Sequence, residues 1–388
     1  MAIRPRVPLA WLNLVSDRRG LATAIAGIAF AVLLMFMMTG FRNAMFDSQV
    51  ELIRLFDADL IIAARDKETL FVAQPFPRQR LLQALGCEGV EGVSPVYLES
   101  VKLRWKDLEH HSEHTIRAIG FDPVEPVFLD PRIRRGAAAL KELDTVLFDT
   151  KARPVYGRVG PGTKAELADR VVRVVGTFEM GPDFVIDGSV LMSDRNLANF
   201  LSDPRSPRGR LASVDIGLVR LTPGADLETV RSTLRRLLPG DVVVYTKPEL
   251  IKLEMRFWGR TTPIGYVFDL ATGVGFAVGI VIAYQIIFTS VAANNKQYAT
   301  LKAIGYSNGY LVRAVLKQSL LLALLGFGPG LVLSAVIFRS IARYGSLLMR
   351  LTAPRAGLIL ALTTVMCLIS GAIAIRKILS SHPAEVFG

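Results

Sequence analysis

The residues with the most evident capacity for chemistry form a polar run at 109–114, Glu-His-His-Ser-Glu-His, which is the only histidine cluster in the chain. Imidazole and carboxylate groups this close together could bind zinc or copper, with His110, His111 and His114 as the candidate ligands. A consecutive polar run between strands is more often a solvated loop. The loop is the favoured interpretation, so the sequence predicts no metal site.

The glycine-rich stretch 157–164, Gly-Arg-Val-Gly-Pro-Gly-Thr-Lys, looks at first sight like a phosphate-binding loop. Such a loop needs Lys followed by Ser or Thr, so that the ammonium reaches the phosphates and the hydroxyl reaches Mg²⁺. Here Thr163 precedes Lys164, and Pro161 removes one backbone N–H from the cradle. There is also no Ser-His-Asp set or carboxylate pair in a supporting context. The sequence therefore predicts no catalytic site and no cofactor in this chain.

The most informative segment is 295–306, Asn-Lys-Gln-Tyr-Ala-Thr-Leu-Lys-Ala-Ile-Gly-Tyr, which lies between two long apolar stretches. Tyr298, Leu301 and Ile304 share one face of a helix, with Lys302 beside it. Gly305 then fits the glycine that ends a helix. A short amphipathic helix in this place could lie on a membrane surface or dock into a partner protein.

The chain contains four stretches of at least 20 residues without Asp, Glu, Lys or Arg, and the short helix lies between the second and the third. At 1.5 Å rise per residue, about 20 apolar residues cross a hydrocarbon core of about 30 Å. The hydrophobic fraction of 51% and the mean hydropathy of +0.38 are high for a soluble protein. The sequence therefore predicts transmembrane helices at 20–41, 270–293, 318–338 and 356–375, the first of which is longer than a cleavable signal.

Two of these spans contain glycines four residues apart, Gly275 with Gly279 and Gly326 with Gly330. Small residues at this spacing let neighbouring helices approach closely. Glycine is also simply common in membrane helices, so this packing role is one of two interpretations.

Charge placement predicts the orientation. Basic residues gather in 1–19, 294–317 and 376–388, which lie on one side of four spans and are therefore expected to be cytoplasmic, together with both termini. The short loop 339–355 carries four arginines on the other side, against this rule. The net charge of +12 collects beside the spans, which favours anionic lipid as the partner and argues against nucleic acid.

Residues 42–269 read as one large extracytoplasmic domain of mixed α/β pattern. Apolar, β-branched runs predict strands, and a strand at 214–221 followed by a helix at 227–238 and a strand at 242–245 forms a βαβ-like unit. Asp194 is expected to cap a helix at 195–201. Helical patterns at 42–55 and 250–262 predict a stalk between the domain and the spans.

At the segment Tyr298–Tyr306 the sequence resembles the coupling helix between spans two and three of the MacB/FtsX family of ABC permeases. The ending Pro383-Ala384-Glu385-Val386 is similar to the Pro-x-Glu ending of that family, whose layout is also one span, a large outer domain and three further spans. Within the family the sequence looks most like the DevC permeases of heterocyst-type glycolipid exporters. The blocks that carry this likeness are Ala26–Phe30, Leu34–Met37, Gly40–Arg42, Asp57–Asp59, Thr145–Asp149, Thr262–Gly265 and Ser370–Ala374.

The resemblance implies the permease subunit of an ABC exporter in a bacterial inner membrane. It implies a second copy of the chain and a separate cytoplasmic ATPase that binds ATP and Mg²⁺. It also implies a periplasmic adaptor, a TolC-like outer-membrane duct, and export of a lipid or other periplasmic cargo. The outer domain would divide into a membrane-proximal part, about 56–100 and 212–249, and an inserted tip, about 101–211.

The resemblance further implies which residues face the ATPase: Gln297, Tyr298, Leu301, Lys302, Ile304 and Gly305. The family commonly has an acidic residue where Gln297 stands, so a charge contact at that position is not implied.

Three alternatives remain open. A lipoprotein-releasing permease of the same superfamily would hand its cargo to a soluble carrier and need no duct. A membrane-bound sensor would read a ligand outside, although the short inner loop and the lack of a cytoplasmic output domain argue against it. A membrane-anchored enzyme would depend on the histidine cluster.

Overall fold

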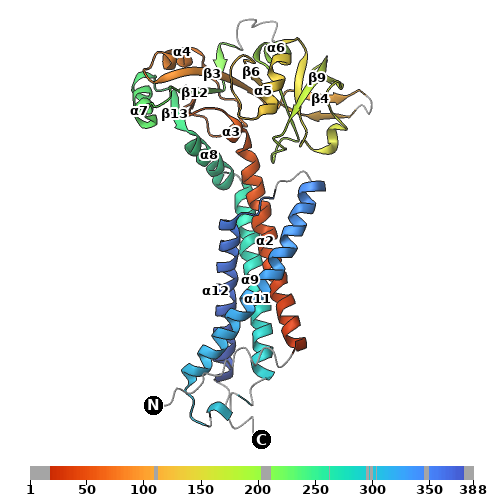
Figure 1. Ribbon diagram of the computed structural model, residues 1–388, viewed down its shortest axis with the longest axis vertical. Coiled ribbons are helices and arrows are strands. Elements are labelled where there is room, and N and C mark those ends of the chain that lie inside the picture. Colours follow the sequence, from red (N-terminus) through yellow and green to blue (C-terminus); the bar gives the residue numbers. More distant parts are fainter. Residues whose placement is uncertain are drawn as a thin grey trace. The chain divides into compact units, whose positions relative to one another are not determined.

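The computed structural model describes residues 18–108, 112–201, 211–261, 263–293, 297, 300–302, 304–344 and 349–379. The chain divides into two compact units (Figure 1). One unit contains the long apolar helices, and the other is formed chiefly by Ala44–Ile264.

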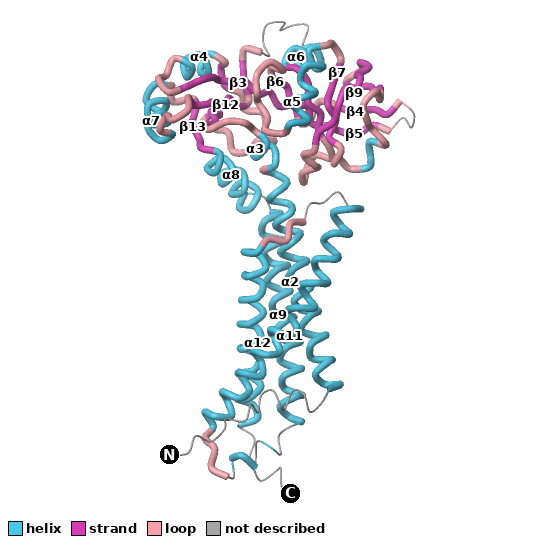
Figure 2. Tube along the Cα trace, viewed as in Figure 1, coloured by secondary structure: helices cyan, strands magenta, loops and turns pink. Residues whose placement is uncertain are grey.

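The membrane unit consists of four long helices, α2 (Arg18–Gln49), α9 (Pro263–Ala293), α11 (Asn308–Tyr344) and α12 (Ala353–Leu379). These are the helices of the described chain that are long and apolar enough to cross a membrane, by length and composition. Figure 2 shows them side by side as a bundle. The predicted fold class, four transmembrane helices with a large α/β domain between the first and the second, is confirmed.

The helices extend beyond the charge-free stretches that predicted them. α11 begins at Asn308 instead of residue 318, and it continues to Tyr344 without a break at Pro329. The absence of charge marks the apolar core of a span, whereas backbone hydrogen bonding continues through amphipathic turns such as the one that contains Arg313 and Lys317. Charge alone therefore underestimates helix length.

An 11-stranded mixed sheet forms the centre of the outer unit, with the strand order β13-β1-β12-β3-β6-β10-β7-β9-β8-β4-β5. A second sheet pairs only β2 with β11. The strands are β1 (Leu60–Ala64), β2 (Phe76–Pro77), β3 (Val90–Glu99), β4 (Arg104–Asp107), β5 (Glu113–Thr115), β6 (Arg117–Phe121), β7 (Thr145–Asp149), β8 (Lys164–Leu167), β9 (Arg170–Phe178), β10 (Ser189–Ser193), β11 (Ser213–Val214), β12 (Ile216–Leu221) and β13 (Val242–Thr246).

Short helices cover this sheet. They are α3 (Glu51–Leu55), α4 (Gln79–Leu85), α5 (Pro131–Ala137), α6 (Asp194–Phe200), α7 (Leu227–Leu237) and α8 (Lys247–Arg256), with 3₁₀ turns η1 (Ala138–Lys141) and η2 (Pro154–Tyr156) and a π-helix η3 (Phe257–Thr261).

The strands β13-β1-β12-β3 form a split βαβ arrangement, because β1 pairs antiparallel with both β12 and β13 and lies between them. Successive residues of β1 point to opposite faces. Leu60 and Ile62 join the apolar cluster that contains α4 and α7 residues, whereas Ile61 joins the cluster that contains α3 and α8 residues. The sheet is therefore covered on both faces by helices.

The remaining seven strands come from residues 104–193, the region expected to form the tip. They continue the same sheet, since β3 pairs antiparallel with β6 from Val96↔Phe121 to Glu99↔Ala118. The expected tip and the expected membrane-proximal part therefore share one continuous sheet.

The helix caps follow the expected chemistry with one correction. Ser193, not Asp194, caps α6, because the Ser193 hydroxyl accepts the backbone N–H of Asn196 at 3.2 Å while Asp194 is already the first helical residue. The Asp226 carboxylate caps α7 through the Thr229 N–H at 2.8 Å. Two adjacent polar residues offer two plausible caps, and only backbone geometry decides between them.

Candidate coupling site

The segment expected to contact an ATPase is described at 297, 300–302 and from 304 onward. Gln297, Leu301 and Lys302 are helical, with Leu301 half-buried and the other two exposed. Ile304 is 71% exposed. Tyr298 lies outside the described residues, as does the ending 383–386.

Gly305 ends this helix in the way that the sequence predicted. Its φ of +101° lies in the left-handed region, which glycine adopts without steric cost. The Gly305 N–H donates to the Lys302 carbonyl at 3.1 Å, and the Tyr306 N–H donates to the Leu301 carbonyl at 3.1 Å. These two hydrogen bonds form the pattern of a Schellman motif. They satisfy backbone carbonyls that would otherwise lack a hydrogen-bond donor at the helix end.

Helical segments lead into the outer domain from both sides, as the amphipathic patterns suggested. α2 runs unbroken to Gln49 and is followed by α3, and α8 is followed by η3. Inside the outer unit the two segments pass close together, since a methyl group at Gly259 would lie 3.6 Å from the Phe46 ring. α8 begins with a capping box between Thr246 and Glu249.

Lys247 joins the start of α8 to the end of α3. Its ammonium group donates to the Phe56 carbonyl and, at 3.5 Å, to the Arg54 carbonyl. A cation at the C-terminal end of a helix also interacts favourably with the helix dipole. Burial lowers the pKa of the Lys247 ammonium group, partly offset by the charges of Asp57 and Asp59.

A buried carboxylate attaches α8 and η3 to the domain. Glu254 is 1% exposed. Its Oε1 accepts the Thr69 hydroxyl at 2.7 Å and the Trp258 indole N–H at 2.8 Å, and its Oε2 accepts the Leu70 N–H at 2.9 Å. We call these four residues the Glu254 network. Trp258 belongs to η3, so the network joins the π-helix to the segment that follows β1.

Lys67 lies beside this network. It is 3% exposed, and its ammonium group donates to the Val72 carbonyl at 3.1 Å. Burial lowers the pKa of the Lys67 ammonium group, against the opposing influence of the Asp215 and Glu254 charges. Burial likewise raises the pKa of the Glu254 carboxyl, while its three donors act in the opposite direction. Buried charged groups of this kind are costly unless they are paired and hydrogen-bonded.

The glycine pairs lie at different kinds of helix contact. A methyl group at Gly330 would lie 2.7 Å from Val32 and 2.9 Å from the Ala29 carbonyl, and one at Gly326 would lie 2.5 Å from Ile28, all on α2. A methyl group at Gly279 would lie 2.5 Å from Met366 of α12. Gly275 has only an ordinary contact with Met38, at 3.8 Å.

Three further glycines at close contacts were not singled out from the sequence. A side chain at Gly27 would meet Ile286, one at Gly40 would meet Phe338, and one at Gly371 would meet Ser319. None of these glycines has another glycine four residues away, so the spacing rule does not identify them.

The candidate metal ligands do not form a described site. His110 and His111 lie outside the described residues. His114 lies in β5 opposite Trp105 of β4, and its ring meets the Tyr156 ring edge-on at 5.9 Å between centroids. Within the described ranges, no group of three His, Cys, Asp or Glu side chains could hold a metal ion.

The glycine-rich stretch 157–164 leads into a strand, β8, whereas a phosphate loop leads into a helix N-terminus. The Gly162 N–H donates to the Val174 carbonyl at 2.7 Å, and the Thr163 N–H donates to the Gly160 carbonyl at 3.0 Å. These amides are used within the fold and do not form an anion cradle.

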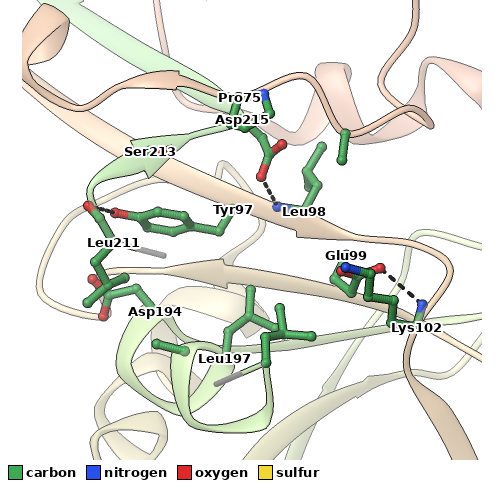
Figure 3. Close-up of a pocket in the computed structure, with 13 residues that line it drawn as sticks. Pro75, Tyr97, Leu98, Glu99, Lys102, Asp194, Leu197, Leu211, Ser213 and Asp215 are labelled. Atoms are coloured by element: carbon green, nitrogen blue, oxygen red, sulfur yellow. Dashed lines mark hydrogen bonds between the residues drawn. The ribbon is translucent and has the colours of Figure 1, made fainter. Parts of the chain in front are cut away.

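A cavity of about 260 Å³ lies between β3, β11 and α6, where the two halves of the sheet meet (Figure 3). The Tyr97 hydroxyl donates to the Leu211 carbonyl at 3.3 Å, and burial raises the pKa of Tyr97 to about 12. Asp215 accepts the Leu98 N–H at 2.9 Å, and Glu99 accepts the Lys102 N–H at 3.0 Å. These polar groups serve the domain itself.

Two protein-family models match the chain. An FtsX-like permease C-terminal model matches residues 270–383, and a MacB-like periplasmic core domain model matches residues 21–237. No curated protein matches the sequence.

Three solved structures are similar to part of the chain. The periplasmic region of MacB from Actinobacillus actinomycetemcomitans is 10% identical, with a TM-score of 0.35 over 51% of this chain and 92% of its own. The extracellular domain of the noncanonic ABC-type transporter YknZ from Gram-positive bacteria is 13% identical, with a TM-score of 0.32 over 49% and 99%. A permease domain from Porphyromonas gingivalis is 16% identical, with a TM-score of 0.31 over 48% and 86%.

Proposed function

This chain belongs to the MacB/FtsX family and is an ABC transporter permease subunit, and we propose that it transmits the motion of a separate ATPase to its outer domain. In this proposal the ATPase binds ATP and Mg²⁺ in the cytoplasm. The helix at 297–305 and both chain termini lie on that side, and the outer domain lies in the periplasm. A second copy of the chain completes the transporter.

The observation that carries the proposal is the Glu254 network. A permease that transmits movement needs a stiff connection between its stalk and its outer domain. Three hydrogen bonds to one buried carboxylate supply such a connection, because each fixes a direction as well as a distance. Apolar contacts alone are non-directional and would allow more sliding.

The surface of the coupling helix supports docking to the ATPase. Ile304 and Tyr306 are exposed apolar side chains at the capped end of a short helix, and Leu301 is half-buried. Exposed apolar residues that adjoin one another mark interaction surfaces more often than chance exposure does. Lys302 and Gln297 supply polar groups at the edge of this surface.

The interior of the bundle supports a cargo route that avoids the membrane centre. Hydrogen bonds between its helices join uncharged groups, such as the Gln318 amide to the Ser290 hydroxyl at 2.8 Å and the Ser370 hydroxyl to the Ile280 carbonyl at 3.0 Å. Polar transport routes through a bilayer are usually lined by ionisable residues, which these spans lack between 270 and 295 and between 318 and 338. We therefore propose that the cargo, a lipid or other periplasmic molecule, is taken from the periplasm or the outer leaflet.

The finer assignment follows the resemblance to DevC permeases. We propose that the chain works with a periplasmic adaptor and a TolC-like outer-membrane duct. Co-purification of an adaptor supports this assignment, whereas a soluble carrier protein in its place indicates the lipoprotein-releasing type.

The test is affinity purification of the full chain from native membranes in mild detergent, followed by mass spectrometry and an ATPase assay. Recovery of an ABC ATPase is expected, and the Leu301→Asp/Ile304→Asp variant should lose it. The matched control is Val124→Asp/Leu143→Asp, which changes two exposed apolar residues of the outer domain and should retain the ATPase. Retention of the ATPase by the helix variant contradicts the docking role. Cargo crosslinked between the spans contradicts the proposed route.

A further inference from the structure

The segment 339–355 has a composition that its place in the chain does not explain. Its four charged residues are all arginine, and it contains no Lys, Asp or Glu. It joins α11 to α12 at the end of the bundle where α2 leads into the outer domain. Basic residues are normally depleted on the non-cytoplasmic side of membrane proteins. Their presence here calls for a chemical reason.

On α11 the arginine continues an exposed apolar stripe. Val332 and Val336 are exposed, and Arg339, also exposed, follows on the same side of the helix at a spacing of three to four residues. The stripe is the surface that acyl chains cover in a bilayer. Arg339 therefore lies where this surface gives way to the headgroups.

α12 repeats the arrangement from its other end. Leu358 is exposed, and half-buried Arg355 lies three residues before it in the first turn of the helix; Leu351, just before the helix, is also exposed. The Arg355 guanidinium donates to the Arg350 carbonyl at 3.1 Å, which holds exposed Arg350 beside it. Two helices thus present arginine at the same boundary.

Helix stability does not account for this charge. Arg355 stands in the first turn of α12, where the helix dipole disfavours a cation, and that turn contains no acidic residue. From residue 265 to 384 the sequence has one acidic residue, Asp269, which pairs with Arg42 of α2 at 2.8 Å.

We propose that this surface, formed by Arg339, Arg350 and Arg355, binds the phosphate groups of anionic phospholipids in the leaflet that adjoins the outer domain. The planar fork of a guanidinium matches two phosphate oxygens, which explains why all four basic residues are arginine. A lipid is the expected source of the phosphate, because each arginine adjoins exposed apolar side chains that acyl chains can cover. The inference is independent of the proposed transport function.

The test uses the full chain in phosphatidylcholine bilayers, with a fluorophore attached to Ser340→Cys. Ser340 is exposed beside Arg339, and Cys87 and Cys367 are buried, so labelling is selective. Quenching by acyl-brominated phosphatidylglycerol is compared with quenching by acyl-brominated phosphatidylcholine, which gives a relative binding constant. Phosphatidylglycerol should bind about fivefold more tightly or better, the contribution of roughly one arginine at an anionic surface.

The variants decide the outcome. Replacing all three arginines with glutamine should bring the relative binding constant close to one. Replacing them with lysine should give a preference between those of the glutamine variant and the unchanged protein, because the charges return without the planar fork. A glutamine variant that keeps the preference overturns the proposal, and so does a lysine variant that loses it. A response to inorganic phosphate without anionic lipid would show a soluble-anion site instead. The matched control, Arg313→Gln/Lys317→Gln/Arg376→Gln at the other end of the bundle, should leave the signal unchanged.

Discussion

Replacing Glu254 with methionine should loosen the junction between α8, η3 and the outer domain. The substitution keeps the volume and removes the carboxylate that accepts the Leu70 N–H and the Trp258 indole N–H. A buried donor left without a partner costs about 1–3 kcal/mol. Two such donors cost about 2–6 kcal/mol, and Lys67 also loses a neighbouring charge. Removing the buried carboxylate also removes its desolvation penalty, which offsets part of this cost. We therefore expect a net loss of about 2–4 kcal/mol in the local free energy of unfolding.

Hydrogen exchange of the full chain measures this loss where it occurs. A local destabilisation of about 2–4 kcal/mol raises the exchange rate about 30- to 700-fold, since 1.4 kcal/mol is about a tenfold change. The increase should be confined to residues 65–72 and 254–261. Thr69→Val is the matched control, because it removes one donor and leaves the carboxylate bonded to Leu70 and Trp258; we expect about 1 kcal/mol or less. Unchanged exchange at these residues in Glu254→Met would refute the reasoning.

Gly330→Val should weaken the contact between α11 and α2 by about 1–3 kcal/mol, because the new side chain meets the Ala29 carbonyl. Thermal unfolding in detergent measures this loss. The control Gly328→Ala, at a position with open space around it, should have little effect. Gly305→Ala should increase hydrogen exchange at 300–306 by an amount equivalent to about 1 kcal/mol, because alanine is strained at a φ of +101°. The control Gly309→Ala should not increase exchange, because the backbone at Gly309 is not in the left-handed region. Glu179 has a pKa lowered by its hydrogen bonds with Arg132 and then Lys151, so its stabilisation is present above the ordinary value of 4.5 and is lost as pH falls below it. Because Glu179 is partly exposed, Glu179→Gln should remove an acid-dependent stability of at most about 1 kcal/mol, and an unchanged pH profile of denaturant unfolding would contradict this assignment.

Local patterns in the sequence were sufficient to predict the elements that depend on nearby residues. The span helices, the strand of 242–245, the helix of 227–238 and the glycine at 305 each follow from periodicity, charge or a single backbone requirement. The βαβ-like unit also followed, although the sequence did not show that β1 lies between its two strands. That arrangement depends on pairing between residues about 155 to 186 positions apart, which periodicity does not encode.

The Glu254 network escaped sequence reasoning for the same reason. Glu254 occurs in an amphipathic stretch and reads as a solvent-facing residue, but its partners Thr69 and Leu70 come from a distant segment that folds back onto α8. The π-helix at 257–261 has no sequence signature of its own. Glycine spacing found the contacts at Gly326 and Gly330 but not those at Gly40 and Gly371, because a single glycine acquires meaning only from the side chain opposite it.

The arrangement of the apolar core limits how the proposed motion could enter the outer domain. α3 and α8 are in contact and bury Ile53, Phe56 and Leu250 in one cluster with Ile61 of β1. Moving one helix without the other would expose large apolar side chains, at about 1.5–3 kcal/mol for each side chain that becomes solvated. Lys247 adds hydrogen bonds from α8 to the end of α3. The two helices should therefore move together with the sheet, so that bending concentrates outside this cluster and outside the Glu254 network, which fixes η3 to the domain.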